Sequence, residues 1–249
     1  VNQRTLLFFT VVLLLSIGIV MIYSTSAIFA QERFNDGYYY LKRQAQWIAL
    51  GLGAFAVAMN TDYHNLRAHS VTLIFGSLAL LALVYVPGIG RSAGGASRWI
   101  RLGGFSFQPS EIAKLALILY MADVMARKQR QIDRFWRGLA VPLLLFGTAL
   151  GLIILQPDLG TTILCALVTG IMLFVAGVRM RLLAPLCLAS VPAIYALVFS
   201  SHYRTRRIMA FVNPWADPEG TGFQIIQSFI ALGSGGLTGL GLAQSRQKF

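Results

Sequence analysis

Long runs of apolar residues alternate with short polar segments along most of the chain. Seven runs approach the roughly 20 apolar residues that a helix needs to cross a bilayer. The last 50 residues differ, being rich in Arg, Asp, Pro and Gly. The pattern predicts an all-α, polytopic membrane bundle in residues 1–199, followed by a large extracytoplasmic loop at 200–249. The predicted helices are 5–27, 45–59, 70–86, 109–126, 139–155, 159–178 and 182–199.

The composition supports a membrane location. Of 249 residues, 56% are hydrophobic and 12% are charged, whereas a soluble domain carries roughly a quarter charged residues. The net charge of +12 comes from basic residues in the segments between helices. This distribution suits an anionic lipid surface or a lipid-linked anionic substrate, and we expect no nucleic-acid partner.

The basic segment 127–137 sets the predicted orientation. Counting Lys and Arg over all loops does not decide the topology, so we weight this short, dense segment and assign it to the cytoplasm. The N-terminus is then cytoplasmic, and 88–107, read as a Gly-, Ser- and Arg-rich loop, lies outside together with 200–249. We expect a multi-pass protein of the bacterial inner (plasma) membrane.

Glu111 and Lys114 are three residues apart and share one face of the predicted helix 109–126. Ionisable groups within a span are costly and usually line a cavity or bind a ligand. The two residues could be a buried ion pair that fixes helix packing. Alternatively, Lys114 could contact a phosphate while Glu111 holds the lysine in place.

Two further polar segments precede predicted helices. Arg91, Arg98 and Arg101 surround Trp99, which is typical either of a solvated loop with an interfacial Trp or of a phosphate-binding loop whose indole stacks on a ligand. Asp158 directly precedes an apolar run. We favour a helix cap for this carboxylate, with a place in the lining of an outer cavity as the alternative.

Cofactor motifs are lacking. Cys165 and Cys187 lie in apolar runs without metal-ligand spacing, so we expect no metal site. The Gly-rich end of the chain could cradle phosphates through backbone N–H groups, but it contains no ATP-binding glycine loop. We expect no cofactor, although a diphosphate substrate could bring a Mg²⁺ ion with it.

Several separate blocks together resemble the SEDS family, whose members include FtsW, RodA and SpoVE. The resemblance covers nearly the whole chain, and the Gly222-Phe223-Gln224 and Gln247-Lys248 elements are similar to those of the FtsW/SpoVE branch. The blocks are 98–103, 107–114, 156–161, 207–218, 222–228, 233–236 and 247–248.

The resemblance implies a peptidoglycan glycosyltransferase that polymerises lipid II during division or related wall synthesis. Its expected partners are a class B penicillin-binding protein and divisome-type membrane proteins. The family fold has ten transmembrane helices, of which this chain would supply about seven. A lipid II flippase, or a non-catalytic scaffold for a penicillin-binding protein, would also need a polar path within the bundle.

Site residues follow from the same resemblance. Glu111 and Lys114 are the predicted catalytic residues in this chain, with Lys114, Arg98 and Arg207 facing the leaving diphosphate. The essential carboxylate of the family is expected beyond Phe249, so we expect this chain to be truncated and inactive alone. The predicted substrate-binding residues are Arg98, Trp99, Gln108, Ser110, Asp158, Arg207, Gln224, Ser228 and Lys248.

Overall fold

The computed structural model describes residues 2–87, 89–93, 96–102, 105–132, 134–200, 202–236, 238–241 and 244–245. The chain divides into two compact units. Unit 1 comprises Val1–Thr61 and Ile194–Phe249, and unit 2 comprises Asp62–Ala193. The helix α8 (Met180–Phe199) begins in unit 2 and ends in unit 1.

Unit 1 begins with two long helices, α1 (Gln3–Phe34) and α2 (Tyr39–Asn60), which pack against each other. The Asn2 side chain accepts from the Arg4 N–H and caps α1. Asn35 ends the helix in the left-handed conformation, with φ of 54°. Most large apolar side chains of α1 are exposed, as expected for a helix that faces lipid.

The C-terminal part of unit 1 is largely helical. It contains α9 (His202–Val212), a 3₁₀ turn η3 (Pro214–Ala216) and α10 (Phe223–Gly235), so the described part of the predicted loop includes helical elements. A Cβ atom at Gly222 would lie 2.0 Å from the Pro214 carbonyl oxygen. Only glycine therefore fits where α10 begins beside η3.

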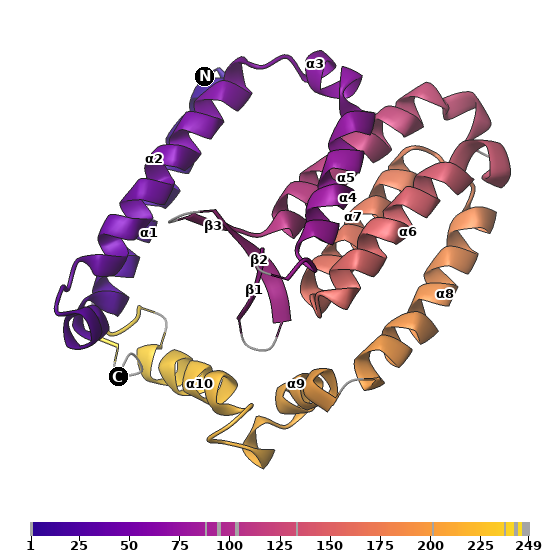
Figure 1. Cartoon of the computed structure of the whole chain (residues 1–249). Coiled ribbons are helices and arrows are strands. Elements are labelled where there is room, and N and C mark those ends of the chain that lie inside the picture. The colour runs from indigo at the N-terminus through magenta and orange to yellow at the C-terminus, as the bar shows by residue number, and fades with distance from the viewer. Residues whose placement is uncertain are drawn as a thin grey trace. The chain divides into compact units, whose positions relative to one another are not determined.

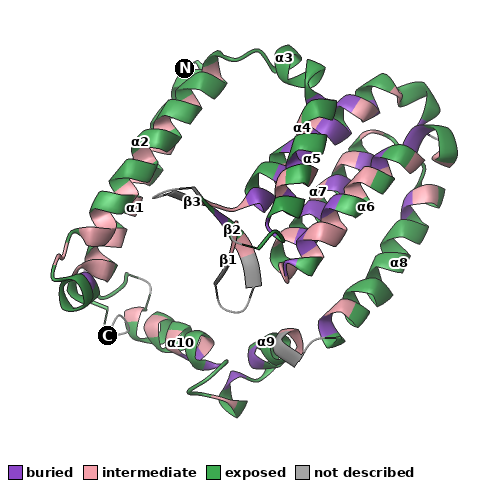
Figure 2. Ribbon diagram, in the orientation of Figure 1, coloured by how far each residue is buried: buried purple, intermediate pink, exposed green. Residues whose placement is uncertain are grey.

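Unit 2 is built around a bundle of α4 (Ser70–Leu83), α5 (Pro109–Arg127), α6 (Ala140–Leu155) and α7 (Leu159–Val175) (Figure 1). The short α3 (Tyr63–Ala68) precedes α4, and the turns η1 (Gln129–Gln131) and η2 (Phe135–Leu139) connect α5 to α6. The buried residues lie on the faces that these helices turn toward each other (Figure 2). The core includes Ile74, Leu81, Leu117, Met121 and Ile153.

A small antiparallel sheet lies where α5 begins. Its strands are β1 (Gly90–Ala93), β2 (Ala96–Leu102) and β3 (Phe105–Phe107), in the order β1-β2-β3. The sequence reading of 88–107 as a loop is therefore wrong for these residues. The frequent Gly and Ser suggested irregular backbone, whereas the strands pair the backbone groups with each other. Ile100 of β2 is buried.

The described helices are consistent with a membrane protein. Three segments are long and apolar enough to cross a bilayer, namely Gln3–Phe34, Phe135–Leu155 and Met180–Phe199. Ser70–Leu83 and Leu159–Val175 are shorter apolar helices, and both end before the predicted limits of 86 and 178. The predicted all-α, polytopic membrane fold is confirmed, with the sheet as an addition.

Candidate functional site

Arg98 joins the sheet to the turn between α6 and α7. Its Nε donates to the Gln156 carbonyl oxygen at 2.8 Å, and its terminal nitrogen donates to the Pro157 carbonyl. A guanidinium is favourable at this position because the carbonyl groups at a helix C-terminus lack helical partners and carry partial negative charge. Trp99, the next residue on β2, is 38% exposed.

Asp158 is the N-cap of α7. Its carboxylate accepts from the Thr161 N–H at 3.1 Å and from the Thr161 hydroxyl at 2.9 Å. Gln108, at the start of α5, donates its side-chain amide to the same carboxylate at 3.0 Å and to the Ser110 hydroxyl at 2.8 Å. The predicted capping role is confirmed. A role of Asp158 in substrate binding stays a prediction.

Gln156 links this turn to α4. Its side chain is 1% exposed and donates to the Leu81 carbonyl oxygen at 3.1 Å. Within the described residues, its Oε1 atom is buried without a hydrogen-bond partner. Burying an unpaired acceptor is costly. The sequence reading included Gln156 in a motif but gave it no role.

Glu111 and Lys114 form the expected ion pair on α5, with Lys114 Nζ 2.8 Å from Glu111 Oε2. The lysine side chain is 25% exposed and the glutamate 60%. Lys114 also lines a pocket of about 80 Å³ between α5 and α7. The other lining residues are mostly apolar: Leu117, Ile118, Leu164, Cys165, Val168 and Thr169.

Unit 2 thus brings together two groups of predicted site residues. Arg98, Gln108, Ser110 and Asp158 are connected through the α6–α7 turn, and the Glu111–Lys114 pair follows one turn further along α5. Within the described part of the chain, neutral groups donate to the Asp158 carboxylate, and the ion-pair partner of Lys114 is the exposed carboxylate of Glu111. This arrangement can present an ammonium group to an anionic ligand beside an apolar surface.

The remaining predicted residues belong to unit 1. The Ser228 hydroxyl donates to the Gln224 carbonyl oxygen within α10, and Arg207 lies on α9. Lys248 lies outside the described residues. Among the described residues, no group of three or more His, Cys, Asp or Glu could hold a metal ion.

Among the described residues of unit 1, Asp217 is the carboxylate with the most hydrogen bonds. It accepts from the Thr221 N–H and hydroxyl, both at 3.0 Å, and from Arg206 at 3.1 Å. These hydrogen bonds, first that from the Thr221 N–H, lower the pKa of Asp217 below its ordinary value. The interactions stabilise the segment between η3 and α10, and the sequence reading assigned Asp217 no role of its own.

Comparison with known proteins identifies relatives over nearly the whole chain. Residues 4–249 match the FtsW/RodA/SpoVE family, described as cell cycle protein. A probable peptidoglycan glycosyltransferase FtsW of Geobacter sulfurreducens is 48% identical over 231 residues, which cover 93% of this chain and 62% of the relative. Stage V sporulation protein E of Bacillus subtilis is 43% identical over 244 residues, covering 98% and 67% of the two chains.

Two solved structures are similar. A chain from work on the structural coordination of polymerization and crosslinking by a peptidoglycan synthase complex is 34% identical, with a TM-score of 0.68, covering 90% of this chain and 65% of that one. The rod shape determining protein RodA of Thermus thermophilus is 32% identical, with a TM-score of 0.56, covering 73% and 58%. The chain therefore spans about two thirds or less of the length of these relatives.

Proposed function

The chain belongs to the FtsW/RodA/SpoVE family, and we propose that it is a peptidoglycan glycosyltransferase that polymerises lipid II. The name of the FtsW relatives, probable peptidoglycan glycosyltransferase, supports this activity. The observation in unit 2 that carries the proposal is that Lys114 lines a pocket of about 80 Å³ whose other walls are mostly apolar. Lipid II combines an apolar tail with a diphosphate, and this site offers a surface for each.

In the proposed reaction, the 4-hydroxyl of one sugar attacks the anomeric carbon of a second lipid II. Undecaprenyl diphosphate leaves as the new glycosidic bond forms. Lys114 stabilises the negative charge that develops on the leaving diphosphate. Glu111, 2.8 Å from the ammonium group, orients the lysine before substrate binds. We assign the base for the attacking hydroxyl to no residue of this chain.

Arg98 and Arg207 were predicted to share the diphosphate. The Arg98 guanidinium is hydrogen-bonded to two carbonyl groups, so a phosphate would have to share or displace these contacts. We therefore propose that Arg98 acts mainly by holding the α6–α7 turn. Contacts of Arg207, Gln224, Ser228 and Lys248 with substrate remain predictions, as does a Mg²⁺ ion accompanying the diphosphate.

Partners and orientation are part of the same proposal. The similar chain in a peptidoglycan synthase complex supports a class B penicillin-binding protein as partner, and the family description, cell cycle protein, supports work with divisome-type membrane proteins. The protein is an integral membrane protein, and we propose the inner membrane with a cytoplasmic N-terminus. A topology reporter fused at Val1 would test this orientation, and activity only on the outer side would contradict it.

The decisive experiment is polymerisation of labelled lipid II by the purified full-length protein, with no other glycosyltransferase present. Lys114→Gln should slow polymerisation by at least about tenfold, because removing one donor to a developing charge commonly costs 10²–10³ in rate. Lys114→Arg should retain part of the activity. The control Lys42→Gln removes an exposed lysine that pairs with Asp36 and should leave the rate unchanged.

Two results would contradict the proposal. A Lys114→Gln rate within about twofold of the wild type would remove Lys114 from the mechanism. If the wild-type protein moved a fluorescent lipid II across liposomes without forming polymer, the flippase alternative would replace the polymerase.

A further inference from the structure

Asp123 lies in the last turns of α5, at the end of the bundle opposite to the site just described, and its side chain is 3% exposed. Its Oδ1 accepts from Arg67 Nε at 2.8 Å and from Arg127 Nε at 2.7 Å. Its Oδ2 accepts from the Ser70 hydroxyl at 2.7 Å. These contacts connect α3 and the start of α4 to α5, and the proposed reaction uses none of them.

The two arginines are held side by side with a surplus of positive charge. Both use Nε to bind the same oxygen of Asp123, so their guanidinium groups are close neighbours. One carboxylate neutralises only one of the two charges. The side chains are 44% and 55% exposed, and within the described residues the terminal nitrogens of both make no hydrogen bond. Asp123 therefore fixes two guanidinium groups whose outer N–H groups are available to a ligand.

The geometry favours a phosphate. The planar guanidinium presents paired N–H donors that match the oxygens of a phosphate group. Two neighbouring guanidinium groups with a net charge of about +1 suit a phosphodiester, which carries one negative charge. A carboxylate buried beneath the arginines reduces the flexibility that each would lose on binding.

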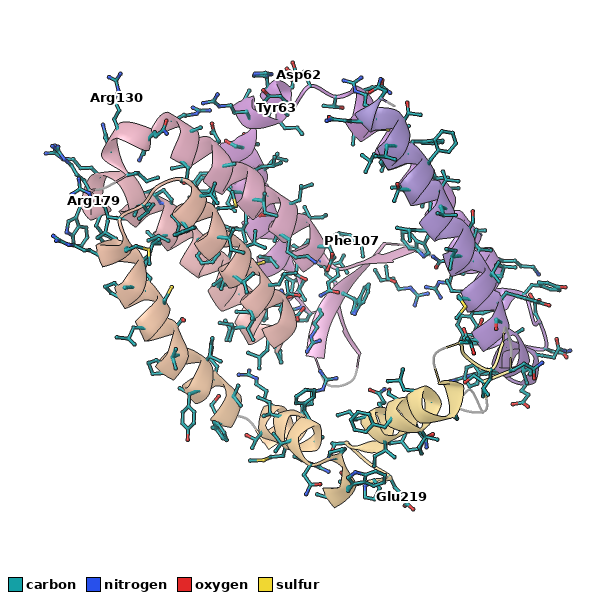
Figure 3. All side chains as sticks on the ribbon, turned by 180° about the vertical axis from the view of Figure 1, so that it is seen from behind. Asp62, Tyr63, Phe107, Arg130, Arg179 and Glu219 are labelled. Carbon is teal, nitrogen blue, oxygen red and sulfur yellow. The ribbon has the colours of Figure 1, made fainter. Side chains whose placement is uncertain are left out.

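The surroundings favour a phosphate that belongs to a membrane lipid. Figure 3 shows Arg179 at the same end of unit 2 as Asp62, whereas Phe107 lies toward the other end. Trp136, in η2 directly before the apolar helix α6, is 83% exposed. Basic residues next to a span bind anionic lipid headgroups, and Trp is enriched at the membrane interface.

We propose that Arg67 and Arg127, held by Asp123, form a binding site for the phosphodiester headgroup of an anionic phospholipid. The site orients the end of α5 and the α3–α4 junction at the membrane surface. It is independent of the proposed glycosyltransferase activity, because it lies at the other end of α5 from Lys114.

The test is the affinity of the full-length protein for soluble, short-chain phosphatidylglycerol, measured by titration calorimetry at constant ionic strength. We expect Arg67→Gln and Arg127→Gln each to weaken binding by about tenfold, the loss of one charge-assisted contact. The control Arg130→Gln removes the same charge from an exposed residue at the same end. It should change the affinity by less than about twofold.

Ser70→Ala separates binding from folding. It removes one donor to Asp123 without changing a guanidinium group, so it should lower the melting temperature while leaving the affinity within about twofold. The site is overturned if Ser70→Ala weakens binding as much as Arg127→Gln, or if Arg130→Gln does, since diffuse charge would then explain the binding.

The source of the phosphate is decided by two further titrations. Short-chain phosphatidylcholine and inorganic phosphate should each bind at least about tenfold more weakly than phosphatidylglycerol. Equal binding of phosphatidylcholine would show that the arginines do not select an anionic headgroup. Equal binding of inorganic phosphate would show a site for a soluble ligand. Either result, or no binding of phosphatidylglycerol, would overturn the proposal.

Discussion

Unit 2 carries a well-coordinated carboxylate near each end of its bundle, and the two differ in their donors. Among the described residues, the donors to Asp158 are neutral groups, the Gln108 amide and the N–H and hydroxyl of Thr161. Asp123 accepts from two guanidinium groups and one hydroxyl. Near Asp158 the cations have other partners, because Arg98 binds carbonyl groups and Lys114 binds Glu111.

A carboxylate in a membrane bundle can therefore have two roles, capping a helix or holding neighbouring cations together. At Asp158 the negative charge is secondary, because a neutral oxygen could accept the same hydrogen bonds and cap α7. At Asp123 the charge is essential, because two neighbouring guanidinium groups would otherwise repel each other. The first arrangement leaves Lys114 with one exposed partner, and the second fixes two arginines in place.

Removing the charge of Asp123 should have the largest effect on stability. Asp123→Asn leaves Arg67 and Arg127 close together without their shared anion. Breaking a fully buried ion pair costs about 3–5 kcal/mol. Because both arginines are roughly half exposed, water screens part of this cost, and we expect the free energy of unfolding to fall by about 2 kcal/mol. Denaturant unfolding in a fixed detergent would measure it.

The control for Asp123 is Asp36→Asn, which removes a carboxylate from an exposed pair with Lys42. Exposed pairs contribute little to stability, so the control should leave unfolding almost unchanged. Equal effects of the two substitutions would contradict the distinction between a shared buried anion and an ordinary surface carboxylate.

Asp158 should tolerate loss of charge but not loss of the hydrogen-bond acceptor. We expect Asp158→Ala to lower the free energy of unfolding by about 1 kcal/mol, the usual contribution of an N-cap. Asp158→Asn should cost only a few tenths, because Asn is also a good N-cap. Denaturant unfolding of both variants would test this. If Asn were as destabilising as Ala, the charge of Asp158 would matter, and the contrast with Asp123 would fail.

The difference between the two carboxylates also explains what the sequence could predict. The cap at Asp158 is a local contact, because its partner Thr161 is three residues away. The Glu111–Lys114 pair is also local, with the same spacing. Local spacing on a helix is visible in a sequence. The positions of the longer helices were likewise predicted because apolar runs have a characteristic length in membranes.

Contacts between distant segments could not be predicted in this way. Arg67 and Asp123 are 56 residues apart, and Arg98 and Gln156 are 58 apart. No periodicity relates such pairs, so Asp123 was missed, and Arg98 was assigned to a solvated loop or to a ligand and not to the α6–α7 turn. The available signal was an Asp within the apolar second half of the predicted helix 109–126, which requires a partner. The strands were missed because they are short and begin and end beside Gly and Ser.

Asp217 of unit 1 tests the comparison of Asp158 with Asp123 through the smallest expected effect. It accepts from neutral donors and from a guanidinium group in an exposed position. The Thr221 N–H and hydroxyl, and then Arg206, lower its pKa. A lowered pKa means that the folded state favours the charged carboxylate. Its contribution to stability is therefore present above the ordinary pKa of about 3.9 and is lost as pH falls through the folded value.

A carbon-13 NMR titration of the Asp217 carboxyl should give a midpoint below about 3.9. Thr221→Val removes the hydroxyl donor and should raise the midpoint. Arg206→Gln should raise it less, since solvent screens an exposed ion pair. This order would show that, at an exposed carboxylate of unit 1, neutral donors lower the pKa more than a cation does. Neutral donors would then be the main partners at Asp217 as they are at Asp158. A larger rise with Arg206→Gln would instead mean that cations dominate at exposed carboxylates as they do at Asp123.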